Sequence, residues 1–288
     1  KLMRIACIGE AMLELSVQDN SAEMAVAGDT LNTAIYLKRN APDCQVDYIS
    51  RLGNCSFSHR IRDFISAQNV GVKAIEMRPD ETPGLYAITT SDAGERSFTY
   101  WRSASAARTL FDTGDFGILS GYDTLYLSGI SLAILPHAVR LAFLNWLGQS
   151  NVQLIYDSNY RPRLWDSTDH ARQITRSMWY RADIALPSID DEMALFDETA
   201  EQVEKRFTTF RGNGALKRGA DGPVSLGECV IQTYPPAAQV VDTTAAGDSF
   251  NGGYLAALFS GKSQAQALRA GHDLAAQVVQ HRGAIIPA

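Results

Sequence analysis

Short apolar runs of strand type alternate along the chain with longer segments whose apolar residues recur at helical spacing. The runs that predict strands are residues 4–9, 47–52, 124–129, 153–157, 182–186, 224–226 and 230–234. The segments that predict helices are residues 30–39, 56–68, 136–148, 171–180, 200–211, 247–259 and 263–281. This alternation predicts an α/β fold with a doubly wound, mostly parallel sheet flanked by helices on both faces. Ligands of such sheets bind at the carboxyl ends of the strands.

One segment departs from this alternation. Residues 84–90 and 96–102 are two strand-type runs joined by Ser91-Asp92-Ala93-Gly94-Glu95, whose residue types favour a turn. Together with residues 12–16 this hairpin predicts a small β-sheet that acts as a lid over the ligand cleft, although an ordinary edge hairpin is an open alternative. We therefore expect one domain over residues 1–288, with the lid formed by parts of 10–27 and 80–105.

Composition narrows the possible partners. The 288 residues are 45% hydrophobic, which is enough to bury a large core. A net charge of −6 argues against nucleic acid or an anionic membrane as a general partner, and no apolar run is long enough to span a bilayer. The four cysteines show no CxxC pairing, so we expect reduced thiols in a cytoplasmic protein. The five histidines form no metal-ligand pattern in the sequence.

The most informative stretch runs from Asp242 to Phe250 and reads DTTAAGDSF. Ala245, Ala246 and Gly247 leave backbone N–H groups unobstructed at a predicted helix N-terminus, where an anion is favoured. Asp248 lies in the same first turn, where a carboxylate could accept a proton from an attacking hydroxyl while the N–H groups hold a phosphoryl group. Taken alone, this position leaves open that Asp248 only caps the helix.

Three motifs give the chain a family resemblance. The stretch 242–250 resembles the C-terminal signature of the ribokinase-like carbohydrate kinases, residues 27–34 (AGDTLNTA) resemble their substrate-binding motif, and residues 217–222 (KRGADG) resemble their nucleotide-binding glycine loop. The motifs occur in the family's order. The resemblance implies a ribokinase-like fold, ATP as phosphoryl donor, Mg²⁺, and Asp248 as catalytic base beside the N–H groups of residues 245–247.

Shorter motifs resemble the bacterial 2-keto-3-deoxygluconate kinases within that family. They are residues 83–86 (PGLY), 94–96 (GER), 100–102 (YWR), 125–130 (LYLSGI), 159–165 (NYRPRLW) and 282–287 (RGAIIP). This resemblance implies phosphorylation of the terminal hydroxyl of a six-carbon keto acid. Two alternatives remain: a kinase of the same family for a neutral sugar such as fructose or for a nucleoside, and a regulatory protein that binds a sugar acid without catalysis.

The resemblance also implies which residues bind the sugar acid. These are Gly28, Asp29, Asn32, Tyr86, Tyr100, Arg102, Arg161 and Asp248. A carboxylate suits the planar donor fork of arginine, which a neutral hexose would leave without a partner, so Arg102 and Arg161 are its predicted ligands. Gly28 would let the substrate approach the backbone closely. Asp29 is also a plausible N-cap of the helix that begins near residue 30.

The implied nucleotide site lies on the other side of Asp248. Its predicted residues are Asn159, Arg161, Ser188, Lys217, Gly219, Gly222, Ala245, Gly247 and His272. Ser188 and Asp191 stand where many relatives carry the ends of Asn-x-x-Glu, and Asp191 is predicted to reach Mg²⁺ through water. For His272 a place near the adenine and a solvated helix position are both open.

Two further expectations concern the sheet and the assembly. Ala215-Leu216 alone precede Lys217 where relatives have a full strand, so we expect missing residues or an altered sheet there. Exposed strand-type runs such as 96–102 tend to find a partner edge, so we expect a homo-oligomer formed partly through the lid.

Overall fold

The structure is a computed structural model that describes residues 2–91 and 96–288. The predicted turn residues Asp92 to Glu95, including the Gly94-Glu95 part of one motif, lie outside the described residues. Within the described residues, eight strands form the main sheet in the order β12-β11-β10-β9-β8-β1-β4-β5. They are β1 (Arg4–Ile8), β4 (Gln45–Leu52), β5 (Ile75–Met77), β8 (Thr124–Ser128), β9 (Gln153–Asp157), β10 (Ile184–Ala185), β11 (Asn213–Leu216) and β12 (Val224–Leu226). The pairing is parallel except between β11 and β12.

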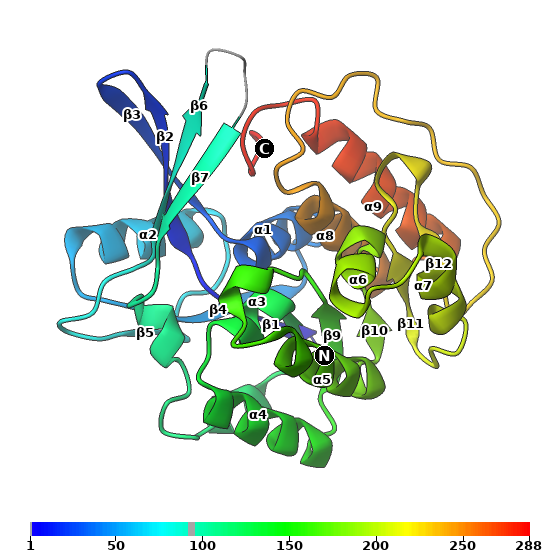
Figure 1. Cartoon of the computed structure of the whole chain (residues 1–288), viewed down its shortest axis with the longest axis horizontal. Helices are drawn as coiled ribbons and strands as arrows, with labels where there is room; N and C mark the ends of the chain where they lie inside the picture. The colour runs from blue at the N-terminus through cyan, green and yellow to red at the C-terminus, as the bar shows by residue number, and fades with distance from the viewer. Residues whose placement is uncertain (1, 92–95) are drawn as a thin grey trace.

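Helices cover both faces of this sheet, as the alternation predicted (Figure 1). On one face lie α1 (Asp29–Asn40), α2 (Ser56–Ala67), α8 (Ala246–Phe259) and α9 (Gln264–Val278). On the other lie α3 (Gly129–Ala133), α4 (His137–Gln149), α5 (Thr168–Arg181), α6 (Ile189–Phe196) and α7 (Ala200–Phe207). Each group packs its apolar stripe on one side of the strands, so two hydrophobic cores sandwich the sheet.

The strand order reverses at β1. The chain goes from β1 to β4 and β5 on one side, and then returns to β8, β9, β10 and β11 on the other. The connections leaving β1 and β8 therefore diverge at their carboxyl ends, which is where doubly wound sheets bind ligands. The fold thus marks the carboxyl end of β1 and β8 as the place to look for a site.

A second sheet stands apart from the main one (Figure 1). We call it the small sheet; its strands are β2 (Met12–Gln18), β3 (Ser21–Ala27), β6 (Leu85–Thr90) and β7 (Arg96–Trp101), in the order β3-β2-β6-β7. The separate sheet predicted from 12–16, 84–90 and 96–102 is confirmed, and the hairpin is not an ordinary edge of the main sheet. β2 and β3 have seven residues each and pair along their whole length as a hairpin. In this region the sequence pattern predicted only a strand at residues 12–16.

Several predicted elements differ in length from those observed. The helix predicted to reach residue 211 ends at Phe207, because the hydroxyls of Thr208 and Thr209 bond to the carbonyls of Lys205 and Arg206. The strand predicted at 182–186 is reduced to Ile184–Ala185.

Residues 230–234 were predicted as a strand and form none. Instead the segment lies against α9, where Arg269 donates to the carbonyl of Thr233 and Gln232 donates to the carbonyl of Ala265. A helix side chain thus satisfies one backbone carbonyl of the segment, and a side chain of the segment satisfies one backbone carbonyl of the helix.

The doubt about the strand before Lys217 is resolved. β11 begins at Asn213 and has four residues, because Asn213 and Gly214 pair with Ile184 and Ala185 and extend the run Ala215-Leu216 backwards. A Cβ at Gly214 would lie 1.9 Å from the Ala185 carbonyl oxygen, so glycine is required for this close pairing. The sheet is therefore continuous through this region.

No helix among the described residues is long and apolar enough to cross a membrane.

Candidate active site

Asp248 occupies the first turn of α8, the helix that follows the small-residue loop. The residue before the helix, Ala245, has a left-handed backbone with φ of 59°, an unusual conformation for a residue with a side chain. It turns the chain sharply into the helix and leaves the first backbone N–H groups without helical partners. The Asp248 side chain does not cap the helix: its Oδ2 accepts a 2.9 Å hydrogen bond from Nδ2 of Asn32 on α1. The capping alternative for Asp248 is therefore wrong.

Carboxylates gather around this helix end. Asp29 begins α1 and accepts hydrogen bonds from Oγ of Ser128 and, at 2.7 Å, from Nδ2 of Asn159. Asp157 ends β9, and its Oδ2 accepts 2.6 Å and 2.7 Å bonds from Lys217 and Asn251. The three acids thus come from the carboxyl end of β9 and from the N-termini of α1 and α8, next to the point where the strand order reverses.

Burial and this crowding shift the protonation of Asp248. Burial, followed by the neighbouring charge of Asp29, raises the pKa of Asp248 well above its ordinary value. The hydrogen bond from Asn32 and the charge of Lys217 act in the opposite direction and lower it. A carboxyl group with a raised pKa is a stronger base once ionised, which suits proton abstraction from a hydroxyl.

Lys217 brings a positive charge to the loop that precedes α8. Its ammonium is only 10% exposed, and a Cβ built at Gly247 would lie 3.6 Å from its Nζ. The ammonium therefore lies beside the unobstructed backbone of Gly247 at the helix N-terminus. A lysine and free helical N–H groups at one point form a site for an anion such as phosphate.

The predicted glycine loop follows directly from β11. Gly219 and Gly222 both have positive φ, 58° and 78°, which favours glycine at each position. A Cβ at Gly222 would meet the Tyr234 ring at 2.5 Å, whereas Gly219 faces open space. His272 on α9 is buried beside Tyr234, and its Nε2 lies 2.7 Å from the carbonyl oxygen of Pro235. A solvated position for His272 is therefore wrong.

Ser188 and Asp191 lie near the same strand ends. Ser188 precedes α6 and forms an isolated parallel bridge with Lys217. Asp191 accepts a 3.3 Å hydrogen bond from Arg161. Burial raises the pKa of Asp191 to about 6; the charge of Arg161 lowers this pKa, and the charge of Asp157 raises it by a smaller amount. Asp157 and Asp191 thus form a pair of oxygen donors, each already paired with a cationic side chain, Lys217 and Arg161 respectively.

Gly28 allows a close contact within the chain, in addition to its predicted place beside the substrate. A Cβ there would lie 2.2 Å from the carbonyl oxygen of Glu10, so the glycine is needed for contact between two chain segments. Asp29 is not the N-cap, because the helix begins at Asp29 and Gly28 stands in the capping position. Asn32 uses its amide nitrogen for Asp248, while its buried Oδ1 has no hydrogen-bond partner among the described residues.

Tyr86 and Tyr100 are directly paired across β6 and β7 and share one face of the small sheet, as predicted. Their rings stack with centroids 5.4 Å apart. The Tyr86 hydroxyl donates to Glu14 on β2, a buried carboxylate. Tyr100 remains 52% exposed, so the pair presents one buried and one accessible ring.

Each of the two predicted carboxylate ligands is bonded to an acid of the chain. Arg102 donates through Nη2 to Glu10, whose side chain is 1% exposed, and Arg161 donates to Asp191. Arg161 is 53% exposed, so its guanidinium is accessible from solution. Glu10 Oε1 and Arg102 Nε are buried and have no partner within the described part of the chain. Buried polar atoms without partners indicate groups that a ligand or water satisfies.

The pfkB family carbohydrate kinase model matches residues 3–288. The chain belongs to this family. It is 42% identical to the 2-dehydro-3-deoxygluconokinase of Dickeya dadantii over 302 residues, with 98% of this chain and 96% of that protein covered. It is 39% identical to the enzyme of the same name from Escherichia coli K12, with 99% and 97% covered. A 2-dehydro-3-deoxygluconokinase structure from Thermotoga maritima superposes with a TM-score of 0.84 at 18% identity, covering 99% and 95%, and supports the fold.

Sequence reasoning missed three acids of this kinase: Glu10, Glu14 and Asp157. Asp157 had a usable signal, because it ends a buried strand and such ends meet at the ligand edge of the sheet. Glu10 and Glu14 lie between apolar residues on a segment that read as an ordinary strand. Their burial depends on partners about 70 to 90 residues away, at Tyr86 and Arg102, which no local pattern reveals.

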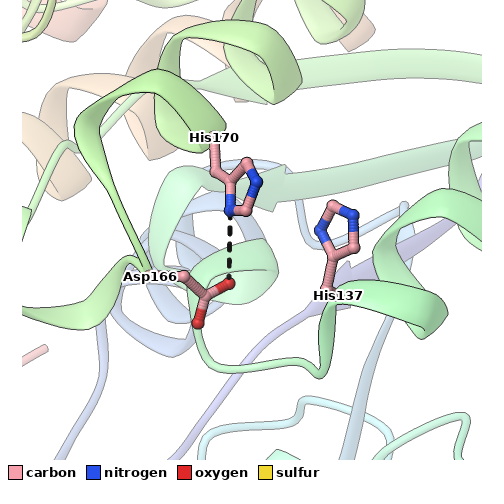
Figure 2. A group of neighbouring side chains, drawn as sticks. All are labelled: His137, Asp166 and His170. Carbon is pink, nitrogen blue, oxygen red and sulfur yellow. Dashed lines mark ion pairs between the residues drawn. The ribbon is translucent and has the colours of Figure 1, made fainter.

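The histidine prediction for this kinase was wrong in one respect. His137, Asp166 and His170 come together so that one ligand atom of each lies within 4.8 Å of the others (Figure 2). The two rings stack with centroids 4.8 Å apart, and the buried guanidinium of Arg140 donates to Asp166 at 2.8 Å. Arg140 already neutralises Asp166 and would repel a cation, so the geometry favours a polar contact between α4 and α5 over a metal centre.

Proposed function

We propose that this carbohydrate kinase transfers the γ-phosphoryl group of ATP to the terminal hydroxyl of 2-keto-3-deoxygluconate (2-dehydro-3-deoxygluconate), giving 2-keto-3-deoxy-6-phosphogluconate. The observation that carries the proposal is the position of Asp248. Its carboxylate lies in the first turn of α8, in the same helix end where Gly247 and Lys217 form an anion site. A base and a phosphate site so close together suit phosphoryl transfer to an alcohol.

In the proposed reaction Asp248 accepts the proton of the attacking hydroxyl. The hydroxyl oxygen forms a bond to the γ-phosphorus while the bond from phosphorus to the β,γ-bridging oxygen breaks, releasing ADP. The N–H groups of Ala245 and Gly247, with Lys217, stabilise the charge that develops on the transferred group, while the N–H of Ala246 donates to the carbonyl of Thr243 at 3.1 Å. Asn32 orients the base through its 2.9 Å hydrogen bond and offers its free Oδ1 to a substrate hydroxyl.

The nucleotide is proposed to lie along Lys217 to Gly222 and against the loop before α8. Gly219, open to solvent, allows phosphates to approach the backbone. Ser188 and Asn159 flank this position from neighbouring strand ends, and His272 with Tyr234 lies on the α9 side. The side chain of Arg161 is exposed, so its guanidinium is available to either the nucleotide or the sugar acid.

The acidic residues of the site fit a divalent cation. Asp157 and Asp191 offer the hard oxygen donors that a divalent cation prefers, and each is also paired with a cationic side chain of the chain. Mg²⁺ bound with ATP would neutralise charge on the phosphates. Asp191, through water, and Asp157 are the residues proposed to hold it.

The keto acid is the proposed substrate for two reasons. Relatives that are 39–42% identical over almost their whole length are named 2-dehydro-3-deoxygluconokinase. Arg102 and Arg161 also supply guanidinium groups, which would bind a carboxylate by charge-assisted hydrogen bonds. Tyr86 and Tyr100 are proposed to cover the sugar acid when the small sheet closes as a lid. A cytoplasmic location remains a prediction, supported by the requirement for ATP.

The direct test is to incubate the protein with ATP, Mg²⁺ and either 2-keto-3-deoxygluconate or fructose, and to follow products by ³¹P NMR. A monoester on the terminal carbon of the keto acid, formed with a kcat/KM at least about tenfold above that for fructose, is the expected result. Preference for fructose would favour the neutral-sugar alternative. Binding of the keto acid with no phosphoryl transfer would favour the non-catalytic regulator.

A further inference from the structure

An ion pair joins the small sheet to the loop that carries the catalytic groups. Arg96 is the first residue of β7, and its Nη1 donates to Oδ1 of Asp242 at 2.7 Å and to Oγ1 of Thr244 at 3.2 Å. The two partners are 146 residues apart in sequence. Asp242 begins the DTTAAGDSF stretch, six residues before Asp248. The contact therefore links an element far from α8 to the segment leading into it.

Asp242 collects hydrogen bonds from three parts of the molecule. Besides Arg96, its oxygens accept bonds from the backbone N–H and hydroxyl of Thr244, at 2.9 Å and 2.6 Å, and from the N–H of Gly283 at 3.0 Å. These donors hold the pKa of Asp242 below its ordinary value. The carboxylate thus fixes the start of the catalytic loop against the C-terminal segment, and Arg96 adds the small sheet to the same centre.

The environment separates this pair from an ordinary surface ion pair. Exposed pairs contribute little because water screens them and because two flexible side chains must be ordered. Here the Asp242 side chain is only 8% exposed, and the Arg96 guanidinium also lies over the Phe98 ring, 5.5 Å from its centroid. Both residues line a cleft of about 930 Å³ between the small sheet and the C-terminal segment. The Arg96–Asp242 ion pair therefore lies where open space separates the small sheet from the C-terminal segment.

We propose that Arg96 is a positioning residue that fastens the small sheet, in its closed position, to the loop forming the phosphate site. Closing the sheet over a sugar acid brings Arg96 to Asp242, and the added donor holds the Asp242–Gly247 backbone in the conformation that presents its N–H groups. Closure and assembly of the phosphate site are thereby coupled. This inference rests on the proposed function, because it assigns the contact a role in phosphoryl transfer.

The coupling has a consequence for water. A small sheet that is fastened over the acceptor keeps water from the γ-phosphate during transfer. Loss of the contact leaves the sheet freer and the loop less fixed. We therefore expect transfer to the acceptor to fall while hydrolysis of ATP to water falls less or rises, so the ratio of hydrolysis to transfer increases.

The test uses Arg96→Gln, Asp242→Asn and the double variant, with Arg78→Gln as matched control. Arg78 is also 32% exposed and also forms ion pairs, with Glu76 and Asp112, but at the edge of the main sheet. Two readouts are taken on each protein. One is the amount of ATP hydrolysed per acceptor phosphorylated, and the other is amide hydrogen exchange in residues 85–90 and 242–247 with ATP and keto acid bound.

We expect Arg96→Gln to lower kcat/KM for the acceptor about tenfold, to raise the hydrolysis-to-transfer ratio, and to speed exchange in both segments. Arg78→Gln should leave all three unchanged, and Arg96→Gln should add little in the Asp242→Asn background. Arg96→Gln behaving like Arg78→Gln, or losing as much in the Asp242→Asn background as alone, would overturn the inference. If the wild type phosphorylates no keto acid, the proposed function fails, and hydrogen exchange with ATP alone still decides whether the contact couples the two segments.

Discussion

The side-chain amide of Asn32 donates a 2.9 Å hydrogen bond to the carboxylate of Asp248, joining residues 216 positions apart. Helices α1 and α8 pack side by side, which places the two first turns together. The contact fixes the direction of the Asp248 carboxylate. It also stabilises the charged form of an acid that burial and Asp29 push toward the neutral form.

Replacement of Asp248 by Asn should remove the base while keeping the shape of the side chain. We expect the turnover number to fall by at least about a hundredfold, the usual scale for a lost general base. Because the charged carboxylate is disfavoured in this acidic cluster, Asp248→Asn should not lower the melting temperature at neutral pH. Steady-state kinetics and a thermal melt check both. Turnover within a fewfold of the wild type would show that the assigned role is wrong.

The pH dependence of kcat/KM should report the raised pKa of Asp248. The base works only when ionised, so activity is lost as pH falls through its pKa, and the acid limb should lie well above the ordinary carboxyl value near 3.8. Asn32→Ala removes a hydrogen bond that lowers this pKa, so its acid limb should move to higher pH. A pH profile of both proteins is the measurement. An acid limb below about pH 5 in the wild type, or no movement in the variant, would contradict the assignment.

The two arginines should decide the class of substrate. If both bind one carboxylate, each contributes a charge-assisted hydrogen bond of roughly 1.5–3 kcal/mol, so removing either should raise the KM for the keto acid about ten- to a hundredfold. The KM for a neutral sugar should change little. Lysine should not fully restore binding, because it lacks the planar fork. Equal losses on both substrates would favour the fructokinase-like alternative.

Arg102→Ala needs a control for loss of stability, whereas Arg161→Ala does not, because Arg161 is exposed. Arg102→Ala alone leaves the buried Glu10 carboxylate without its partner, which is strongly destabilising. The double variant Glu10→Gln with Arg102→Gln removes both charges, leaves Glu10 with its volume, and keeps a polar side chain at both positions. It should restore the melting temperature relative to Arg102→Ala while the keto-acid KM stays high.

The exposed aromatic residues of β7 support the predicted homo-oligomer. Phe98, Tyr100 and Trp101 are 45%, 52% and 58% exposed, an unusual density of accessible aromatic surface on one strand. We expect light scattering to give more than one subunit per particle, and Trp101→Lys to shift the mass toward that of one chain. A wild type that is monomeric at working concentration would exclude assembly through this sheet.

Local sequence was enough to find most elements and to place Asp248 in the first turn of a helix. The helix and strand periods predicted the two-faced sheet, and the DTTAAGDSF stretch predicted a helix N-terminus with Asp248 in its first turn. Local information failed at residues 230–234, which have strand-type composition but lie against α9. It also failed at β11, where Gly214 was treated as loop and instead allows a close strand pairing.

By itself, then, the sequence determined the fold class, the small sheet and the position of the base, because these depend on residue spacing over one or two turns or strands. The tertiary structure alone decided that Asn32 meets Asp248, that Glu10 holds Arg102, and that Arg96 reaches Asp242. Each of these pairs joins segments about 90 or more residues apart, and their protonation and orientation follow from burial and from neighbouring charges. Those quantities exist only once the strand ends, the helix N-termini and the small sheet have come together.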